Sequence, residues 1–226
     1  MNFIAHYYLE RERRQDWVVV GVSTPDLVSI FVLKARVKLT DFLYAERKDT
    51  RKEAFLTGIK SHIDADKIFH SAPFFHEETK LLSNMLREAV HPLELRRSFF
   101  IAHILFELIL DKILVQQHPQ LLEEFYEHME NPQLQDIESL TEWLLQHELP
   151  GYAHFYQRFV QRRYLEEYTE WKNIIYVLKR VMGRVNLDMK EVFYAPQVIA
   201  CLEAYEKQLT PKVEIYMDYL REEMSE

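Results

Sequence analysis

Two segments of this chain carry ionisable side chains at steps of four residues, the spacing that suits metal-assisted or acid–base chemistry on a helix. On a helix with about 3.6 residues per turn, residues four apart lie on one face. Each segment therefore predicts a polar stripe along one side of a helix. The members of the two stripes are His62, Asp66 and His70 in the first, and His103, Glu107 and Asp111 in the second.

The second stripe lies in a segment that is apolar almost all round, from Phe99 to Leu110. A helix of that kind is normally buried. Buried imidazoles and carboxylates are costly unless they are paired, hydrogen-bonded or bound to a metal. Two such stripes predict a metal site between packed helices.

Two further residues, His6 and Asp26, complete the candidate site. Mixed imidazole and carboxylate ligands suit Mn, Fe, Zn or Mg, and one metal or a pair about 3.5–4 Å apart would activate a water and polarise a phosphoryl oxygen. The other polar residues would orient ligands or donate a proton. The predicted ligands are His6, Asp26, His62, Asp66, His103 and Glu107. The predicted catalytic residues are Asp66, His70 and Asp26.

Each member also has a simpler explanation. A lone His6 on an apolar face is typical of a core histidine, and Asp26 is typical of the first turn of a helix. Asp66 has Lys60 and Lys67 as potential ion-pair partners, and Asp111 has Lys112 or an arginine. The stripes as a whole are also compatible with a satisfied internal network in a helical interaction protein.

Composition favours a single helical domain that spans residues 1–226. The chain has 226 residues, 4 glycines and a hydrophobic fraction of 48%, which is enough for a core and is unlike a turn-rich β-sandwich. We expect the site-bearing helices in 1–118 and a helical scaffold in 119–226. The net charge of −8 argues against a general nucleic-acid binder. The oligomeric state stays open.

The one cysteine, Cys201, allows no intrachain disulfide, so a reducing compartment is the default. The first residues lack a basic region followed by a cleavable apolar run. No segment reaches the roughly 18 apolar residues that span a bilayer. We therefore expect a cytoplasmic protein without a membrane span.

Prolines and apolar periodicity predict where helices begin and end. Thr24 and Pro25 predict a helix start, and the valine-rich segment 17–22 before them fits a short strand or a buried connection. The expected helices are 2–14, 27–37, 40–47, 52–70, 75–90, 93–117, 120–130, 136–147, 151–165, 167–183, 188–193, 196–208 and 211–224.

Several short motifs resemble those of the acyl carrier protein phosphodiesterases. The opening Met-Asn-Phe-Ile-Ala-His is similar to their Met-Asn-Phe-Leu-Ala-His, and the segment from Gly21 to Asp26 is similar to their Gly-Asn-x-x-x-Asp. Gly58-Ile-x-x-His62 resembles their Gly-Ile-x-x-His, and Asp66 falls on the Asp of their Ile-Asp. The patches cover roughly residues 1–115.

This resemblance implies an all-α, HD-phosphohydrolase-like fold and a metal-dependent phosphodiesterase, with manganese as the usual metal. Such enzymes release 4′-phosphopantetheine from holo acyl carrier protein, so an acidic protein is the implied partner. Carried over by position, His6, Asp26, His62 and Asp66 match the family in residue type.

The chain departs from the family at other site positions. His70 stands where the family has the Asp of Thr-Asp, and His103-x-x-x-Glu107-Leu108 stands where it has Asp-x-x-x-Asp-His. Each replaced carboxylate remains a residue that can bind a metal. We therefore expect a phosphoester hydrolase with altered metal or substrate preference. The alternative is a non-catalytic helical protein that binds an acyl or lipid-like ligand or a protein partner.

Overall fold

The computed structural model describes residues 1–32, 35–40, 43–44, 49–90, 95, 97–185, 187 and 191–225. These residues form eleven α-helices and four short 3₁₀ helices, with no strand among them. The all-α prediction is confirmed. None of the described helices is both long and apolar enough to cross a bilayer. The HD-phosphohydrolase-like arrangement stays a prediction.

The described residues group into two compact units. Unit 1 comprises residues 1–66 and 120–164, and unit 2 comprises residues 67–119 and 165–226. Each unit draws helices from both halves of the chain. The predicted single domain, with its division near residue 118, stays a prediction.

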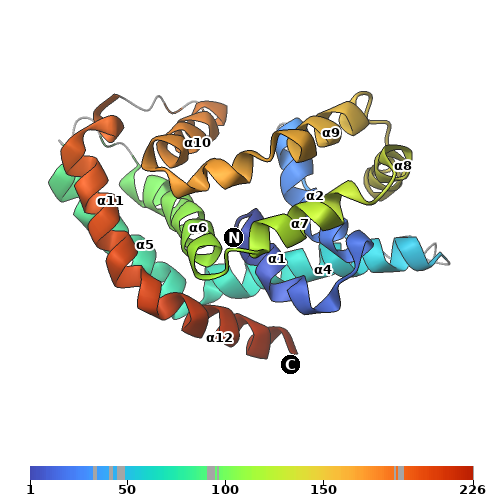
Figure 1. Cartoon of the computed structure of the whole chain (residues 1–226), viewed down its shortest axis with the longest axis horizontal. Coiled ribbons are helices and arrows are strands. Elements are labelled where there is room, and N and C mark those ends of the chain that lie inside the picture. Colours follow the sequence, from blue (N-terminus) through green and yellow to red (C-terminus); the bar gives the residue numbers. More distant parts are fainter. Residues whose placement is uncertain are drawn as a thin grey trace. The chain divides into compact units, whose positions relative to one another are not determined.

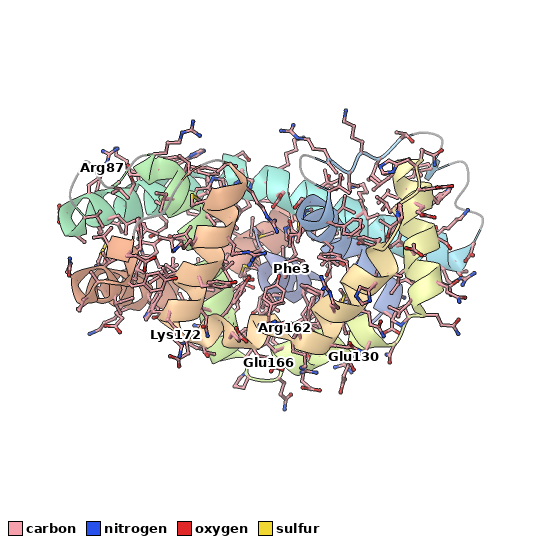
Figure 2. The ribbon with its side chains drawn as sticks, turned by 90° about the horizontal axis from the view of Figure 1, so that it is seen from above. Phe3, Arg87, Glu130, Arg162, Glu166 and Lys172 are labelled. Atoms are coloured by element: carbon pink, nitrogen blue, oxygen red, sulfur yellow. The ribbon has the colours of Figure 1, made fainter. Side chains whose placement is uncertain are left out.

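Unit 1 is built around α1 (Phe3–Glu10), α2 (Asp16–Phe31) and the part of α4 (Thr50–Ser71) that ends at Asp66. It also holds α7 (Leu121–Glu130), α8 (Leu134–Leu145) and α9 (Tyr152–Arg162), and η1 (Arg11–Arg13) follows α1. The side chain of Phe3, labelled in Figure 2, is buried and its ring centroid lies 5.1 Å from that of Phe159. This contact ties α1 to α9 and buries apolar surface, the main stabilising term of such a fold.

Unit 2 contains α5 (Pro73–Ala89), α6 (Ser98–Gln117), α10 (Trp171–Arg184), α11 (Pro196–Leu209) and α12 (Val213–Ser225). Three short 3₁₀ helices connect them: η2 begins in unit 1 and spans Tyr164–Thr169, and η3 (Glu191–Tyr194) and η4 (Thr210–Lys212) follow. The helices α5 and α11 lie side by side, and α5 also packs along α6 (Figure 1). Arg87 (Figure 2) donates from Nε to Ser98 Oγ at 2.8 Å and joins the end of α5 to the start of α6.

The expected helix start at Thr24-Pro25 is wrong. Helix α2 runs from Asp16 to Phe31 with Pro25 inside it. Ser23 and Thr24 do not cap a helix; their hydroxyls donate to the carbonyl oxygens four residues earlier, at 3.0 and 2.7 Å. Such bonds within a helix offer the hydroxyl a partner without ending it.

The valine-rich segment 17–22 is therefore helical, not a strand or a connection. Val18, Val19, Val20 and Val22 are all buried. Burial on several sides of the helix outweighs the weak β preference of valine, because tertiary packing overrides local propensity. The expected helix 27–37 ends at Phe31 in the described residues.

Most other predicted helices agree with the structure to within a few residues. The first stripe lies on α4 and the second on α6, as expected. Pro73 and Pro196 occupy the first turns of α5 and α11, a position where a missing N–H costs nothing. Much of 40–47 and 188–193 lies outside the described residues, as does most of the predicted start of α6 at 93–97.

Candidate functional site

The close packing of α2 against α4 positions the first group of polar side chains. A Cβ on Gly58 would lie 2.1 Å from the Val18 carbonyl oxygen, and one on Gly21 would lie 2.2 Å from the Phe55 carbonyl oxygen. Only glycine allows two helix backbones to approach this closely. The approach brings the Val22 carbonyl oxygen within 2.8 Å of His62 Nδ1.

That hydrogen bond fixes the tautomer of His62. A carbonyl oxygen can only accept, so Nδ1 carries the proton and a neutral imidazole leaves its lone pair on Nε2. Nε2 lies 3.8 Å from Asp66 Oδ2, one turn further along α4. An imidazole held by its other nitrogen in this way is the usual arrangement of a metal-binding histidine.

His6 joins His62 and Asp66 from α1. Its ring stacks on that of His62 with centroids 3.8 Å apart, and its Nε2 lies 3.3 Å from Asp66 Oδ1. Both histidines are at least 95% buried, whereas the Asp66 side chain is 34% exposed. One donor atom from each of the three residues lies within 4.8 Å of the others. We call this set the α4 triad.

Electrostatics favour the neutral form of His62 and the anionic form of Asp66 in the α4 triad. Burial lowers the pKa of His62 well below its usual value, and the neighbouring His6 acts in the same direction. Burial alone would raise the pKa of Asp66, but the Met1 ammonium at 2.6 Å and the His6 imidazole hold it well below its usual range. Neutral His62 and anionic Asp66 are the ligand forms of both groups.

A second group forms in unit 2, where α6 faces the last turn of α4. His103 Nε2 lies 2.9 Å from Glu107 Oε1, and His70 Nε2 lies 3.7 Å from the same oxygen. One donor atom each from His70, His103 and Glu107 again lies within 4.8 Å of the others. We call this set the α6 triad.

The α6 triad is more open than the α4 triad. The side chains of His70 and His103 are 35% and 26% exposed, and that of Glu107 is 13% exposed. Burial alone would raise the pKa of Glu107, but nearby positive charge, including the His103 imidazole, lowers it to about 2. The ring of Phe75 packs in a T-shaped arrangement with both imidazoles, at 4.7 and 4.9 Å between centroids, and limits how these rings can turn.

The structure brings five of the six predicted ligands, together with His70, into these two triads. Asp26 and Asp111 belong to neither among the described residues. Asp26 lies inside α2 on a partly exposed position, and Asp111 is fully buried on α6. The roles predicted for Asp26 stay predictions, as does the convergence of all these side chains on one centre.

Some contacts of the site were not foreseen from the sequence. Glu10 is buried and accepts a hydrogen bond from Ser61, the residue before His62. Its spacing of four from His6 was an available signal, because the same spacing defines the two stripes. Nothing in the sequence pattern pointed to the Val22 carbonyl or to Phe75.

Two of the simpler explanations can be compared with the structure. Lys60 forms an ion pair with Asp64 rather than with Asp66. Lys112, next to Asp111, forms an ion pair with Glu206 on α11. Within each triad the imidazoles face the carboxylate, and Asp66 also forms an ion pair with the Met1 ammonium at 2.6 Å.

Comparison with known proteins places this architecture in a family. Neither the curated proteins nor the solved structures include a significant match. The family model described as acyl carrier protein phosphodiesterase matches residues 1–220. That match extends well beyond the motif-bearing first half and includes the helices that follow α6. The chain therefore belongs to the acyl carrier protein phosphodiesterase family.

Proposed function

We propose that the protein is a divalent-metal-dependent phosphodiesterase that releases the 4′-phosphopantetheine arm from an acyl carrier protein. Family membership supports the substrate class. The observation that carries the metal is His62, whose Nδ1–H is held by the Val22 carbonyl while Nε2 faces Asp66. A histidine that only fills the core does not need a second imidazole and a carboxylate next to its unprotonated nitrogen.

The donor chemistry of both triads fits a divalent metal. Each offers two imidazole nitrogens and one carboxylate oxygen, a set that suits Mn, Fe or Zn, with Mg less favoured by the imidazoles. The family makes manganese the first metal to test. When bound, such a metal acts as a Lewis acid on a phosphoryl oxygen and makes a water more acidic.

In the α4 triad the chain's own groups prepare the ligands. The Val22 carbonyl holds His62 in one tautomer, and the stacked His6 ring restricts its rotation. The depressed pKa of Asp66 keeps its carboxylate anionic at neutral pH. Preorganised ligands of this kind lower the cost of binding a cation.

In the α6 triad we assign proton transfer to His70. Its side chain is the most exposed of the three, and its Nε2 faces Glu107. Glu107 remains anionic and orients His103 through the 2.9 Å contact. His70 would protonate the leaving serine oxygen of the carrier protein, a role for which imidazole has a suitable intrinsic pKa. We assign Asp66 and Asp26 to ligand and water orientation.

The experiment is an assay of holo acyl carrier protein with enzyme purified without a histidine tag. We expect Mn-dependent conversion of the holo to the apo carrier protein, detected by mass spectrometry, and loss of this activity on chelation. His62→Ala should abolish it, while His154→Ala, at an exposed position of α9, should not.

Two results would contradict the proposal. One is less than a tenth of an equivalent of transition metal in the purified protein together with no hydrolysis of an aryl phosphodiester under added Mn. The other is thermal stabilisation by acyl ligands but not by metals, which would favour the non-catalytic binding protein.

A further inference from the structure

Helix α10 is basic, although the chain as a whole is acidic. The chain has a formal net charge of −8. The helix from Trp171 to Arg184 contains four cationic residues and no carboxylate. These residues are Lys172, Lys179, Arg180 and Arg184.

The cations lie on the face of α10 that is turned away from the core. The opposite face is buried through Ile174, Ile175, Leu178 and Met182. Lys172, Tyr176, Arg180 and Arg184 follow one another at steps of four and so form one stripe. Lys172, labelled in Figure 2, and Arg180 are exposed.

One of the four cations is already paired. Lys179 Nζ lies 2.8 Å from Glu191 Oε1 on η3. Glu170 precedes the helix, so described carboxylates flank α10 at both ends. The middle and the C-terminal end of the stripe carry the guanidinium groups of Arg180 and Arg184. A guanidinium group can hold a carboxylate by two parallel hydrogen bonds.

Exposed apolar side chains occur on α10 and close to it along the chain. Five large hydrophobic side chains are exposed in the described residues, and three of them lie on α10, directly after it or on η3. They are Tyr176 at 54%, Val185 at 42% and Tyr194 at 36% exposure. Tyrosine and arginine together are the composition of protein interface hot spots.

We propose that this stripe, formed by Lys172, Tyr176, Arg180 and Arg184, docks the acidic face of the carrier protein. The inference rests on the proposed function for the identity of the partner. The local positive charge of the stripe complements an acidic protein surface, and arginine holds carboxylates well. Helix α10 packs on α6, so a protein bound there is held by the unit that carries the α6 triad.

The test compares an Arg180→Glu/Arg184→Glu variant with a Lys80→Glu/Lys207→Glu variant. Lys80 on α5 and Lys207 on α11 are exposed cations of the same unit, so both variants change the net charge equally. We measure Kd for holo acyl carrier protein by titration calorimetry at low salt, and kcat/KM with Mn for the same protein and for an aryl phosphodiester.

The α10 variant should bind the carrier protein about tenfold more weakly, with the loss shrinking as salt rises, because exposed charges steer and hold the complex through screened interactions. It should hydrolyse the aryl phosphodiester at the unaltered rate. The Lys80/Lys207 variant should bind within about twofold of the original protein. Tyr176→Ala, which removes no charge, should weaken binding at all salt concentrations.

Equal binding by the two charge-reversal variants would overturn the docking surface even if the enzyme is active. Binding of phosphatidylserine vesicles or of a single-stranded RNA oligonucleotide that is lost in the α10 variant, without loss of carrier protein binding, would also overturn it. Absence of all Mn-dependent hydrolysis by the original protein would instead contradict the proposed function. In that case, α10-dependent binding of the carrier protein would still support the surface.

Discussion

Gly21 and Gly58 face each other backbone to backbone where α2 meets α4. A Cβ on Gly21 would lie 3.2 Å from Gly58 Cα, and one on Gly58 would lie 3.0 Å from the Gly21 carbonyl carbon. This contact sets the distance between the Val22 carbonyl and His62. The glycines therefore act on the α4 triad without touching it.

Gly58→Ala should destabilise the protein by about 2 kcal/mol. The added methyl group meets backbone atoms that cannot move aside, which costs about 1–3 kcal/mol or more, and this exceeds the gain of up to about 1 kcal/mol from the better helix propensity of alanine. Urea unfolding measures the change.

Gly183→Ala is the matched control. Gly183 also lies in a helix, but nothing lies within 4 Å of an added Cβ. This substitution should stabilise the protein by about 0.5–1 kcal/mol. If both substitutions changed the free energy of unfolding in the same direction, the close contact of α2 and α4 would not exist in solution.

Metal binding should stabilise the folded protein. A divalent metal at about 100 times its Kd adds about 2.7 kcal/mol, which corresponds to about 5–11 °C in Tm for a chain of this size. Differential scanning calorimetry with Mn, against protein treated with a chelator, gives the shift. His62→Ala should remove the part of the shift that is due to the α4 triad, whereas His154→Ala should leave the whole shift; an unchanged shift in His62→Ala would exclude this triad as a metal site.

The local part of the site could be predicted from the sequence. Steps of four place His62 and Asp66 on one face of any helix, and His103 and Glu107 likewise, so their pairing follows once the helices are recognised. The contact of His6 with His62 and Asp66 depends on how α1 packs, and the spacing of residues in the sequence does not predict that packing. The resemblance to a family supplied that expectation instead.

The helix start at Thr24-Pro25 was predicted wrongly because hydroxyl side chains can either cap a helix or form hydrogen bonds inside one. Ser23, Thr24 and Pro25 fit a helix start, but the two hydroxyls donate backward to Val19 and Val20 and the helix continues. Hydroxyl side chains serve both as caps and as partners within helices, and only the tertiary packing of the valines decides between them. The contact of Gly21 with Gly58 links residues 37 positions apart and is not visible in either helix alone.

His70→Asp should shift the metal preference of the α6 triad. This change puts at position 70 the carboxylate that the resemblance implies there, next to His103 and Glu107. Carboxylates favour Mn and Mg, and imidazoles favour Zn. We expect the ratio of Zn to Mn affinity to fall by about tenfold or more, in the range found for changes around metal ligands.

Competition titration with a chromogenic chelator measures both affinities. His76→Asp, at an exposed position of α5 outside the triads, is the control and should leave the ratio unchanged. An unaltered ratio in His70→Asp would contradict a metal held by His103 and Glu107 beside position 70.

Folding stability should fall as the pH is lowered through the range below about 6.5, and His62 should account for part of the fall. The pKa of His62 is lowered in the folded protein, mainly by burial, so below about pH 6.5 the unfolded chain takes up a proton at His62 that the folded chain does not. The contribution is fully present above the unfolded pKa and is lost at up to about 1.4 kcal/mol per pH unit as the pH decreases. Asp66, whose folded pKa is also lowered, acts in a separate window below about pH 4.

Urea unfolding of metal-free protein at pH 7.5, 6.5 and 5.5 separates His62 from other groups. His62→Gln should lower the stability at pH 7.5 but give a flatter dependence on pH than the original protein, because glutamine takes up no proton in either state. His154→Gln should give the original slope. Parallel curves for the original protein and His62→Gln would mean that His62 accepts a proton as readily in the fold as in the unfolded chain, and that the imidazole is not kept neutral for a metal.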